Sequence, residues 1–205
     1  MQLGEDEARG RILGGAARVF AGTGIRDVSV KDILNAAGVA RRTFYRLYQS
    51  KEDVVVALYR IGTQRLLDEC RLAVSEERDP IRQIQRCIDA HLRNAREVGR
   101  LVFVLGGEAQ RHESALHEHR MQTHAQLVEL LMSSATAAKT NIDPLLVRGL
   151  VLALEGVTRI VLEEGNAGRS VSDAGIERAR RVMYRMATAA LAGEGPGVAP
   201  LPTLK

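Results

Sequence analysis

Residues 29–51 read SVKDILNAAGVARRTFYRLYQSK, and this stretch decides the fold of the chain. Ser29 is a favoured helix N-cap residue, and Asp32 three positions later completes a variant of the capping box. Apolar side chains then recur at helical spacing until Gly38, which supplies a turn. A second short helix is predicted over residues 41–48. Two short helices joined by a tight turn predict a helix-turn-helix (about residues 30–49), whose second helix fits the major groove of DNA.

The two helices divide their residues between an inner and an outer face. The inner face is apolar and is predicted to form the core: Val30, Ile33, Ala37, Val39, Phe44 and Tyr48. The outer face of the second helix carries hydrogen-bond donors: Arg41, Arg42, Thr43, Tyr45 and Arg46. These are the groups that a major-groove helix needs for base edges and phosphates.

Positive charge is concentrated in the same part of the chain. Residues 1–51 contain nine Lys and Arg against five Asp and Glu, which accounts for the whole net charge of +4. Residues 39–51 contain four basic residues and no acidic one. A local basic patch on a neutral body is typical of a protein that reads a polyanion. Charge alone would fit a solvated helix face equally well.

The rest of the chain is also predicted to be helical. Apolar periodicity, caps and breakers predict about nine helices, near residues 5–21, 30–37, 41–48, 51–74, 80 onward, 100–110, 113–138, 144–165 and 172–192. The fold class is therefore all-α, with an irregular tail at residues 194–205 that is rich in Pro and Gly. The predicted helix at 144–165 is apolar nearly all round, so it needs cover on more than one side.

At the helix-turn-helix the sequence resembles the TetR family of bacterial transcriptional regulators, over about residues 9–57. The resemblance rests on Ala37-Gly38-Val39, on Thr43-Phe44-Tyr45 and on Lys51-Glu52-Asp53 at matching spacings. It implies a DNA-binding domain over residues 1–51 and a ligand-binding and dimerisation domain over residues 52–193. It also implies phosphate contacts from Thr43, Tyr45 and Lys51. Ala40 departs from the family pattern, because Ser or Thr usually caps the second helix there.

The full set of expected DNA contacts is Ser29, Lys31, Arg41, Arg42, Thr43, Tyr45, Arg46 and Lys51. Arg41 and Arg42 are the candidates for base edges, since Arg bound to guanine is the commonest specific contact. A recognition helix of two turns covers few base pairs, so specific binding requires two copies on a near-palindrome. The family resemblance implies a homodimer through the last two helices. The expected interface is Val147, Leu150, Val151, Leu154, Ile160, Ile176, Val182, Met183 and Met186.

The resemblance further implies a pocket for a small-molecule effector among the middle helices. All five histidines lie between positions 91 and 124, but their spacings do not suit chelation from one helix, and no metal or cofactor is expected. His117, Met121 and His124 form one helical stripe, which fits interhelical packing better than a pocket lining. Glu155 interrupts an apolar run. A partly buried ion pair with Arg159 is favoured over a role for Glu155 in binding a cationic or hydroxylated ligand. The expected pocket set is His91, Phe103, His117, Met121, His124, Glu155 and Arg159.

Cys70 and Cys87 are interpreted as small buried apolar residues of a cytoplasmic protein. The favoured function is a dimeric repressor that a small molecule releases from its operator. An activator or a ligand-independent DNA binder of the same fold is the alternative. A His-dependent enzyme is a distant third, because the sequence contains no nucleophile elbow, phosphate loop or metal-ligand spacing.

Overall fold

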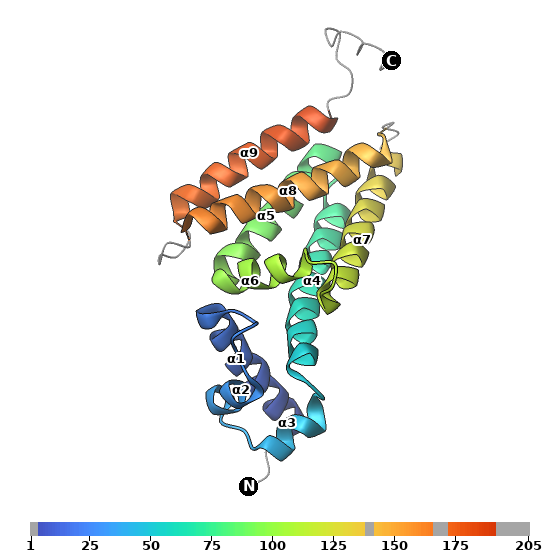
Figure 1. Cartoon of the computed structure of the whole chain (residues 1–205). Coiled ribbons are helices and arrows are strands. Elements are labelled where there is room, and N and C mark those ends of the chain that lie inside the picture. The colour runs from blue at the N-terminus through green and yellow to red at the C-terminus, as the bar shows by residue number, and fades with distance from the viewer. Residues whose placement is uncertain (1–3, 138–141, 166–171, 192–205) are drawn as a thin grey trace, which may run out of the picture.

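The computed structural model describes residues 4–137, 142–165 and 172–191, and these ranges form nine helices and no strand (Figure 1). The helices are α1 (Glu5–Thr23), α2 (Val30–Ala37), α3 (Arg41–Leu47), α4 (Lys51–Glu76), α5 (Pro80–Val98), α6 (Arg100–Ala109), α7 (Ala115–Ala137), α8 (Pro144–Gly165) and α9 (Asp173–Leu191). The all-α prediction is confirmed. The predicted helix ends at 138 and 192 and the tail 194–205 lie outside the described residues.

The helix starts that the sequence predicted have the expected caps. Ser29 Oγ accepts a hydrogen bond from the Asp32 amide, and the Asp32 carboxylate accepts one from the Ser29 amide. Ser50 and Asp53 form the same reciprocal pair at the start of α4. Gly38 adopts φ 63°, the left-handed conformation that glycine tolerates best. The sequence predicted the Ser29 cap and the Gly38 turn, and the Ser50–Asp53 pair fixes the start of α4 by the same chemistry.

Gly15 lets α1 and α2 approach each other closely. A Cβ atom at this position would lie 2.7 Å from the backbone nitrogen of Ala37. The sequence shows four glycines in α1, which weaken an isolated helix. At Gly15 this weakness has a structural reason, because any larger side chain would push the two helices apart.

One apolar core extends from the helix-turn-helix into the larger domain. Ile12, Phe20, Ile33 and Phe44 are fully buried in it. The same cluster continues through α6 and the start of α7 with Leu101, Leu105, Ala109 and Leu116. The DNA-binding domain predicted at residues 1–51 is therefore packed against α6 as well as joined to α4.

A second core joins α5, α8 and α9, which lie together at the upper end of the molecule (Figure 1). Ile88 and Leu92 of α5 pack with Met183 of α9, which is fully buried. Asp89 and Arg180 reinforce this contact with an ion pair of 2.7 Å. The α8 and α9 helices lie side by side, so much of the apolar surface of α8 is covered by the chain itself.

Candidate nucleic-acid interface and buried polar cluster

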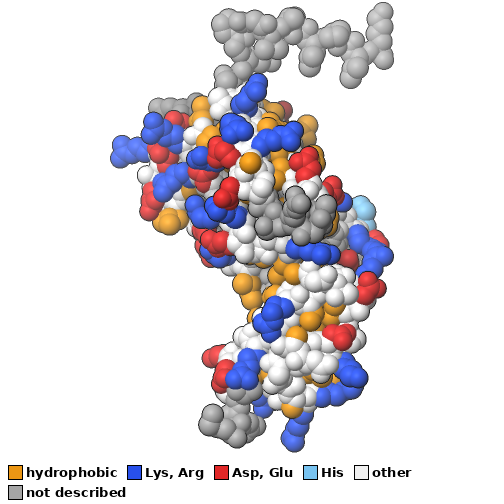
Figure 2. Space-filling view, turned by 90° about the vertical axis from the view of Figure 1, so that its left-hand side faces the viewer, with side chains coloured by type: hydrophobic (Ala, Val, Ile, Leu, Met, Phe, Trp, Pro, Cys, Tyr) orange, Lys and Arg blue, Asp and Glu red, His pale blue; other side chains and the backbone are white. Residues whose placement is uncertain are grey.

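The third helix presents its polar side chains outward at the lower end of the molecule. Phe44 is fully buried and Tyr48 nearly so, which leaves Arg41, Arg42 and Arg46 exposed and Tyr45 43% exposed. Figure 2 shows Lys and Arg side chains gathered at this end. The division into an inner apolar and an outer polar face is as the sequence predicts. The exposed face therefore carries positive charge and hydrogen-bond donors, which suit contact with DNA.

The basic groups on this surface differ in how far they are already engaged. Arg42 and Lys31 make no ion pair or hydrogen bond with any residue that the structure describes, and both are exposed. The Arg41 guanidinium stacks over the Tyr45 ring at 5.3 Å. Arg46 lies 3.6 Å from the Glu5 carboxylate, an exposed pair that contributes little. Arg42 and Lys31 are therefore the least engaged of these basic residues.

Lys51 is placed differently from the other basic residues. Its ammonium donates to the carbonyl oxygens of Ile25 and Val28 at 2.8 Å each, and to that of Arg26 at 3.4 Å. A lysine ammonium has three N–H donors, so all three are used by the loop between α1 and α2. The side chain thus fastens this loop to the start of α4. A phosphate contact would have to replace one of these bonds.

Ser29 is also committed within the chain. Its hydroxyl donates to the Asp32 carboxylate at 2.6 Å while its oxygen accepts from the Asp32 amide. The hydrogen bonds from the Ser29 hydroxyl and amide lower the pKa of Asp32, so this carboxylate stays ionised. The third helix has no such cap, because Ala40 makes no side-chain bond there. Thr43, the remaining expected contact, is half-buried on α3.

A cluster of polar groups is buried between α4, α5, α7 and α8, and we call it the central polar cluster. Its strongest contact joins Arg120 of α7 to Glu155 of α8 by two-pronged hydrogen bonds, with an Nη2–Oε2 distance of 2.5 Å. The two side chains are only 12% and 24% exposed. His124 Nε2 lies 3.6 Å from the same carboxylate. The members are Tyr59, His91, Arg120, His124, Glu155 and Thr158.

His91 is held by Thr158 at 2.9 Å between Nε2 and Oγ1. The Thr158 hydroxyl donates its single proton to the Leu154 carbonyl, so His91 Nε2 is the donor in their bond. Burial lowers the pKa of His91 more than the Glu155 charge raises it. Both histidines of the cluster therefore favour the neutral state, since burial also lowers the pKa of His124.

The carboxylate of the cluster, in contrast to the two histidines, favours its charged state. Burial raises the pKa of Glu155, but the hydrogen bonds from Arg120 and the nearby positive charges outweigh burial, and the net pKa lies below its ordinary value. Burial also raises the pKa of Tyr59 to about 12, helped by the Glu155 charge. The cluster is thus a buried ion pair surrounded by neutral donors and acceptors.

The structure brings together only some of the residues expected to line a pocket. His91, His124 and Glu155 meet in the central polar cluster. Glu155 does not pair with Arg159, because Arg159 points to Glu163 and Gln110 instead. The remaining members of the predicted set lie elsewhere: Met121 is 41% exposed, the His117 ring packs at a tilt against His112, and Phe103 is half-buried on α6.

Sequence reasoning missed Arg120, Thr158 and Tyr59. The stripe chosen on α7 shares His124 with the observed inner face, but that face also contains Leu116, Arg120 and Thr123, which the stripe left out. A buried Glu155 needs a cation, and Arg120 one turn before His124 would have met that need. The signal was therefore present but was assigned to Arg159, which is nearer in sequence.

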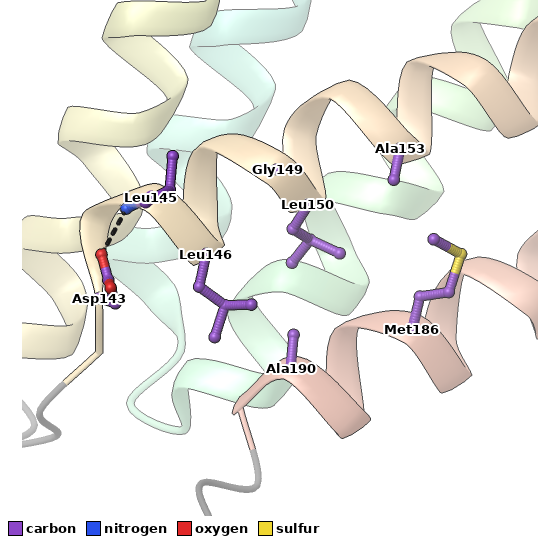
Figure 3. A pocket seen from close by; sticks show the side chains of 8 residues that line it. All are labelled: Asp143, Leu145, Leu146, Gly149, Leu150, Ala153, Met186 and Ala190. Carbon is purple, nitrogen blue, oxygen red and sulfur yellow. Dashed lines mark hydrogen bonds between the residues drawn. The ribbon is translucent and has the colours of Figure 1, made fainter. Parts of the chain in front are cut away.

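A groove with a volume of about 610 Å³ lies between α8 and α9 (Figure 3). Leu145, Leu146 and Ala153 line it from α8, and Met186 and Ala190 line it from α9. Along α8, a stripe of apolar and small residues at helical spacing continues from this groove, exposed at Leu145, Gly149, Leu152 and Ile160 and half-buried at Gly156.

The residues expected at the dimer interface fall into two groups. Val147, Leu150, Val151 and Met183 are buried within the chain itself, although Leu150 also lines the groove. The others reach the surface or are half-buried: Leu154, Ile160, Ile176, Val182 and Met186.

Two other classes of site find no support in residues 4–137, 142–165 and 172–191. No group of three or more His, Cys, Asp or Glu side chains is placed there to hold a metal ion. No described helix combines the length and apolar character that a bilayer span requires.

Comparisons with known proteins agree with the geometry. The family model described as bacterial regulatory proteins, tetR family, matches residues 12–58. The HTH-type transcriptional repressor KstR2 of Mycobacterium tuberculosis is 31% identical over 103 residues, which is 50% of this chain and 52% of that repressor. The chain thus spans about half the length of this curated relative.

Solved structures show the same fold over nearly the whole chain. The fatty acid degradation regulator FadR from Bacillus halodurans has a TM-score of 0.73 at 21% identity, covering 90% of this chain and 97% of that one. SCO4454, a TetR-family transcriptional regulator from Streptomyces coelicolor, has a TM-score of 0.72 at 18% identity, covering 91% and 89%. Residues 12–58 thus match the tetR-family model, α2 and α3 within them form the helix-turn-helix, and the chain shares the fold of solved TetR-family regulators.

Proposed function

We propose that this regulator is a repressor that binds a near-palindromic operator as a homodimer and leaves it when a small molecule binds. The observation that supports DNA recognition best is the outward face of α3, where Arg41, Arg42 and Tyr45 are exposed over a fully buried Phe44. An exposed Arg can bind guanine with two hydrogen bonds, and the basic surface supplies phosphate attraction.

The DNA arm of the proposal is tested by comparing two substitutions on operator and non-operator duplexes. Arg42→Ala should weaken operator binding by about 1–3 kcal/mol and relax the preference at one base pair. Tyr45→Phe, which removes only a hydroxyl, should weaken binding to both duplexes to the same extent. Salt-insensitive binding, or none, by the unaltered protein would remove the proposal.

The dimer rests on the exposed stripe of α8 and the groove beside it. An apolar helix face next to a groove between two helices fits a second copy of the same pair of helices, related by a two-fold axis. A contiguous apolar patch of this kind is unusual on a monomer. We infer that α8 and α9 of two chains pack as four helices.

Leu152→Glu places a charge in the middle of this stripe and should convert the dimer to a monomer in light scattering. Leu72→Glu is the matched control, because Leu72 is 55% exposed on α4, outside the stripe. A dimer that survives Leu152→Glu and dissociates with Leu72→Glu would place the interface on α4 instead.

The effector site is proposed at the central polar cluster. It lies between α4, which leads from the DNA-binding domain, and α8, which carries the dimer stripe, so a ligand there would touch both. Its buried donors and acceptors give a ligand polar partners that an all-apolar core lacks. Fatty acids belong among the first compounds tested, because the structurally similar Bacillus halodurans protein is a regulator of fatty acid degradation.

A fluorescence titration should find a compound whose saturable binding weakens operator affinity. Reciprocal linkage requires operator DNA to weaken the compound's binding by the same factor. An activator or a ligand-independent binder of the same fold would show no such coupled release.

A further inference from the structure

The two cysteines lie opposite each other in the hairpin formed by α4 and α5. Cys70 is in α4, six residues before its end, and Cys87 is in α5, seven residues after its start. At the neck of the hairpin, Gln83 Nε2 donates to the Val74 carbonyl at 3.1 Å. One helical turn deeper on both helices, the Cys87 thiol reaches the Cys70 carbonyl at 3.9 Å. The same register therefore places both thiols on the seam between the helices.

The surroundings make the two thiols unequal. Cys70 is 1% exposed, whereas Cys87 is half-buried and so open to a small solute. The interaction between the two thiols lowers the pKa of Cys87 and raises that of Cys70, and the Arg86 charge lowers the pKa of Cys87 further. The more accessible sulfur is thus also the one that ionises first, which is the usual arrangement of a reactive thiol beside a resolving one.

We propose that Cys87 and Cys70 form a peroxide-sensitive redox pair, which oxidation closes into a disulfide between α4 and α5. The Cys87 thiolate attacks the outer oxygen of a hydroperoxide, breaks the O–O bond and becomes a sulfenic acid while an alcohol or water leaves. The Cys70 thiol then attacks the sulfenic sulfur, and water leaves with the hydroxyl group. Two electrons pass from the two sulfurs to the peroxide, and the products are one disulfide, one alcohol or water, and one further water.

The geometry of the hairpin favours a bond within one chain. Antiparallel helices hold facing residues at nearly constant separation, and the small residues Ala73 and Ala90, both buried, flank the two cysteines on this seam. The site is independent of the proposed effector. It also lies on α4, whose first residue, Lys51, binds the loop between α1 and α2.

The test uses the reduced, full-length protein with hydrogen peroxide at one to a few molar equivalents. Intact mass should fall by two hydrogen atoms, and a reducing agent should restore it. Trypsin without reduction should release the peptide 66–71 linked to the peptide 87–93. This result requires no variant, so it stands even where a substitution impairs folding.

Two variants assign the roles of the sulfurs. Cys70→Ser should stop at a sulfenic acid on Cys87, which dimedone traps. Cys87→Ser should leave Cys70 unreacted over the same period. The proposal fails if peroxide leaves both thiols free, if Cys87 proceeds to sulfinic acid without a cross-link in the unaltered protein, or if the disulfide joins two different chains.

Discussion

Replacing Lys51 with Met tests whether this residue positions the DNA-binding domain or contacts DNA. Methionine keeps an unbranched apolar stem but removes the ammonium. The three carbonyl oxygens of the α1–α2 loop would then lose their common donor. The loop would no longer be fastened to the start of α4.

The magnitude follows from the individual bonds. A hydrogen bond to a charged group contributes about 1.5–3 kcal/mol, and the two bonds of 2.8 Å count fully while the one of 3.4 Å counts little. Because the site is part-buried and water can reach some of the freed oxygens, we expect a net loss of about 2–3 kcal/mol. For a chain of this size that corresponds to a fall in melting temperature of about 4–12 °C.

The assay compares Lys51→Met with Lys31→Met, in thermal unfolding and in the salt dependence of DNA binding at fixed protein concentration. Lys31 is exposed and makes no ion pair with the described residues, so its replacement should change the free energy of unfolding by under about 0.5 kcal/mol. It should reduce the salt slope by about one unit, as expected for a lost phosphate contact. Lys51→Met should weaken DNA binding without changing the slope. A stable Lys51→Met protein with a reduced slope would refute this reasoning and restore the phosphate contact.

Three further predictions concern the interior. Gly15→Ala should destabilise the protein by about 1–3 kcal/mol through a clash with the α2 backbone, whereas Gly10→Ala, with open space around its Cβ, should stabilise it by about 0.5–1 kcal/mol, both read from urea unfolding. Burial lowers the pKa of His91 in the folded state, so the unfolded chain binds the proton first as the pH falls. The free energy of unfolding should therefore decrease below about pH 6.5, by at most about 1.4 kcal/mol per pH unit. His91→Gln should flatten this decrease. Arg120→Met should cost about 1–3 kcal/mol, less than a fully buried pair because Glu155 retains some exposure, and adding Glu155→Gln should recover part of the loss in a double-mutant cycle.

Local chemistry made the helix-turn-helix predictable from sequence. Ser29 with Asp32, Gly38, and the spacing of Phe44 and Tyr48 fix caps, turn and inner face within a few residues of one another, so no distant contact is needed to find them. Lys51 shows the limit of this reasoning. Its type and position indicated a phosphate contact, but the carbonyls that it binds belong to a loop about 25 residues earlier.

The larger domain was less predictable, because its site depends on how helices are rotated against one another. The stripe predicted on α7 included His124 but not the neighbouring row with Leu116, Arg120 and Thr123, so Arg120 was missed and Glu155 was given the wrong partner. Similarly, the apolar residues of α8 could be listed but not divided between the chain's own core and the exposed stripe. That division depends on where α5 and α9 pack, which periodicity on one helix does not reveal.

The apolar core shared by Phe20, Leu101 and Leu105 limits which DNA-binding domains could replace residues 1–51 in a chimera. In a regulator whose DNA-binding domain is joined only by a linker, that domain could be replaced by another with little loss of stability. In this protein, a domain that replaces residues 1–51 must also pack against the surface of α6. Otherwise apolar side chains of both the new domain and α6 would be exposed to solvent. The same packing couples the position of α6 to that of α1, because the two helices share one apolar core.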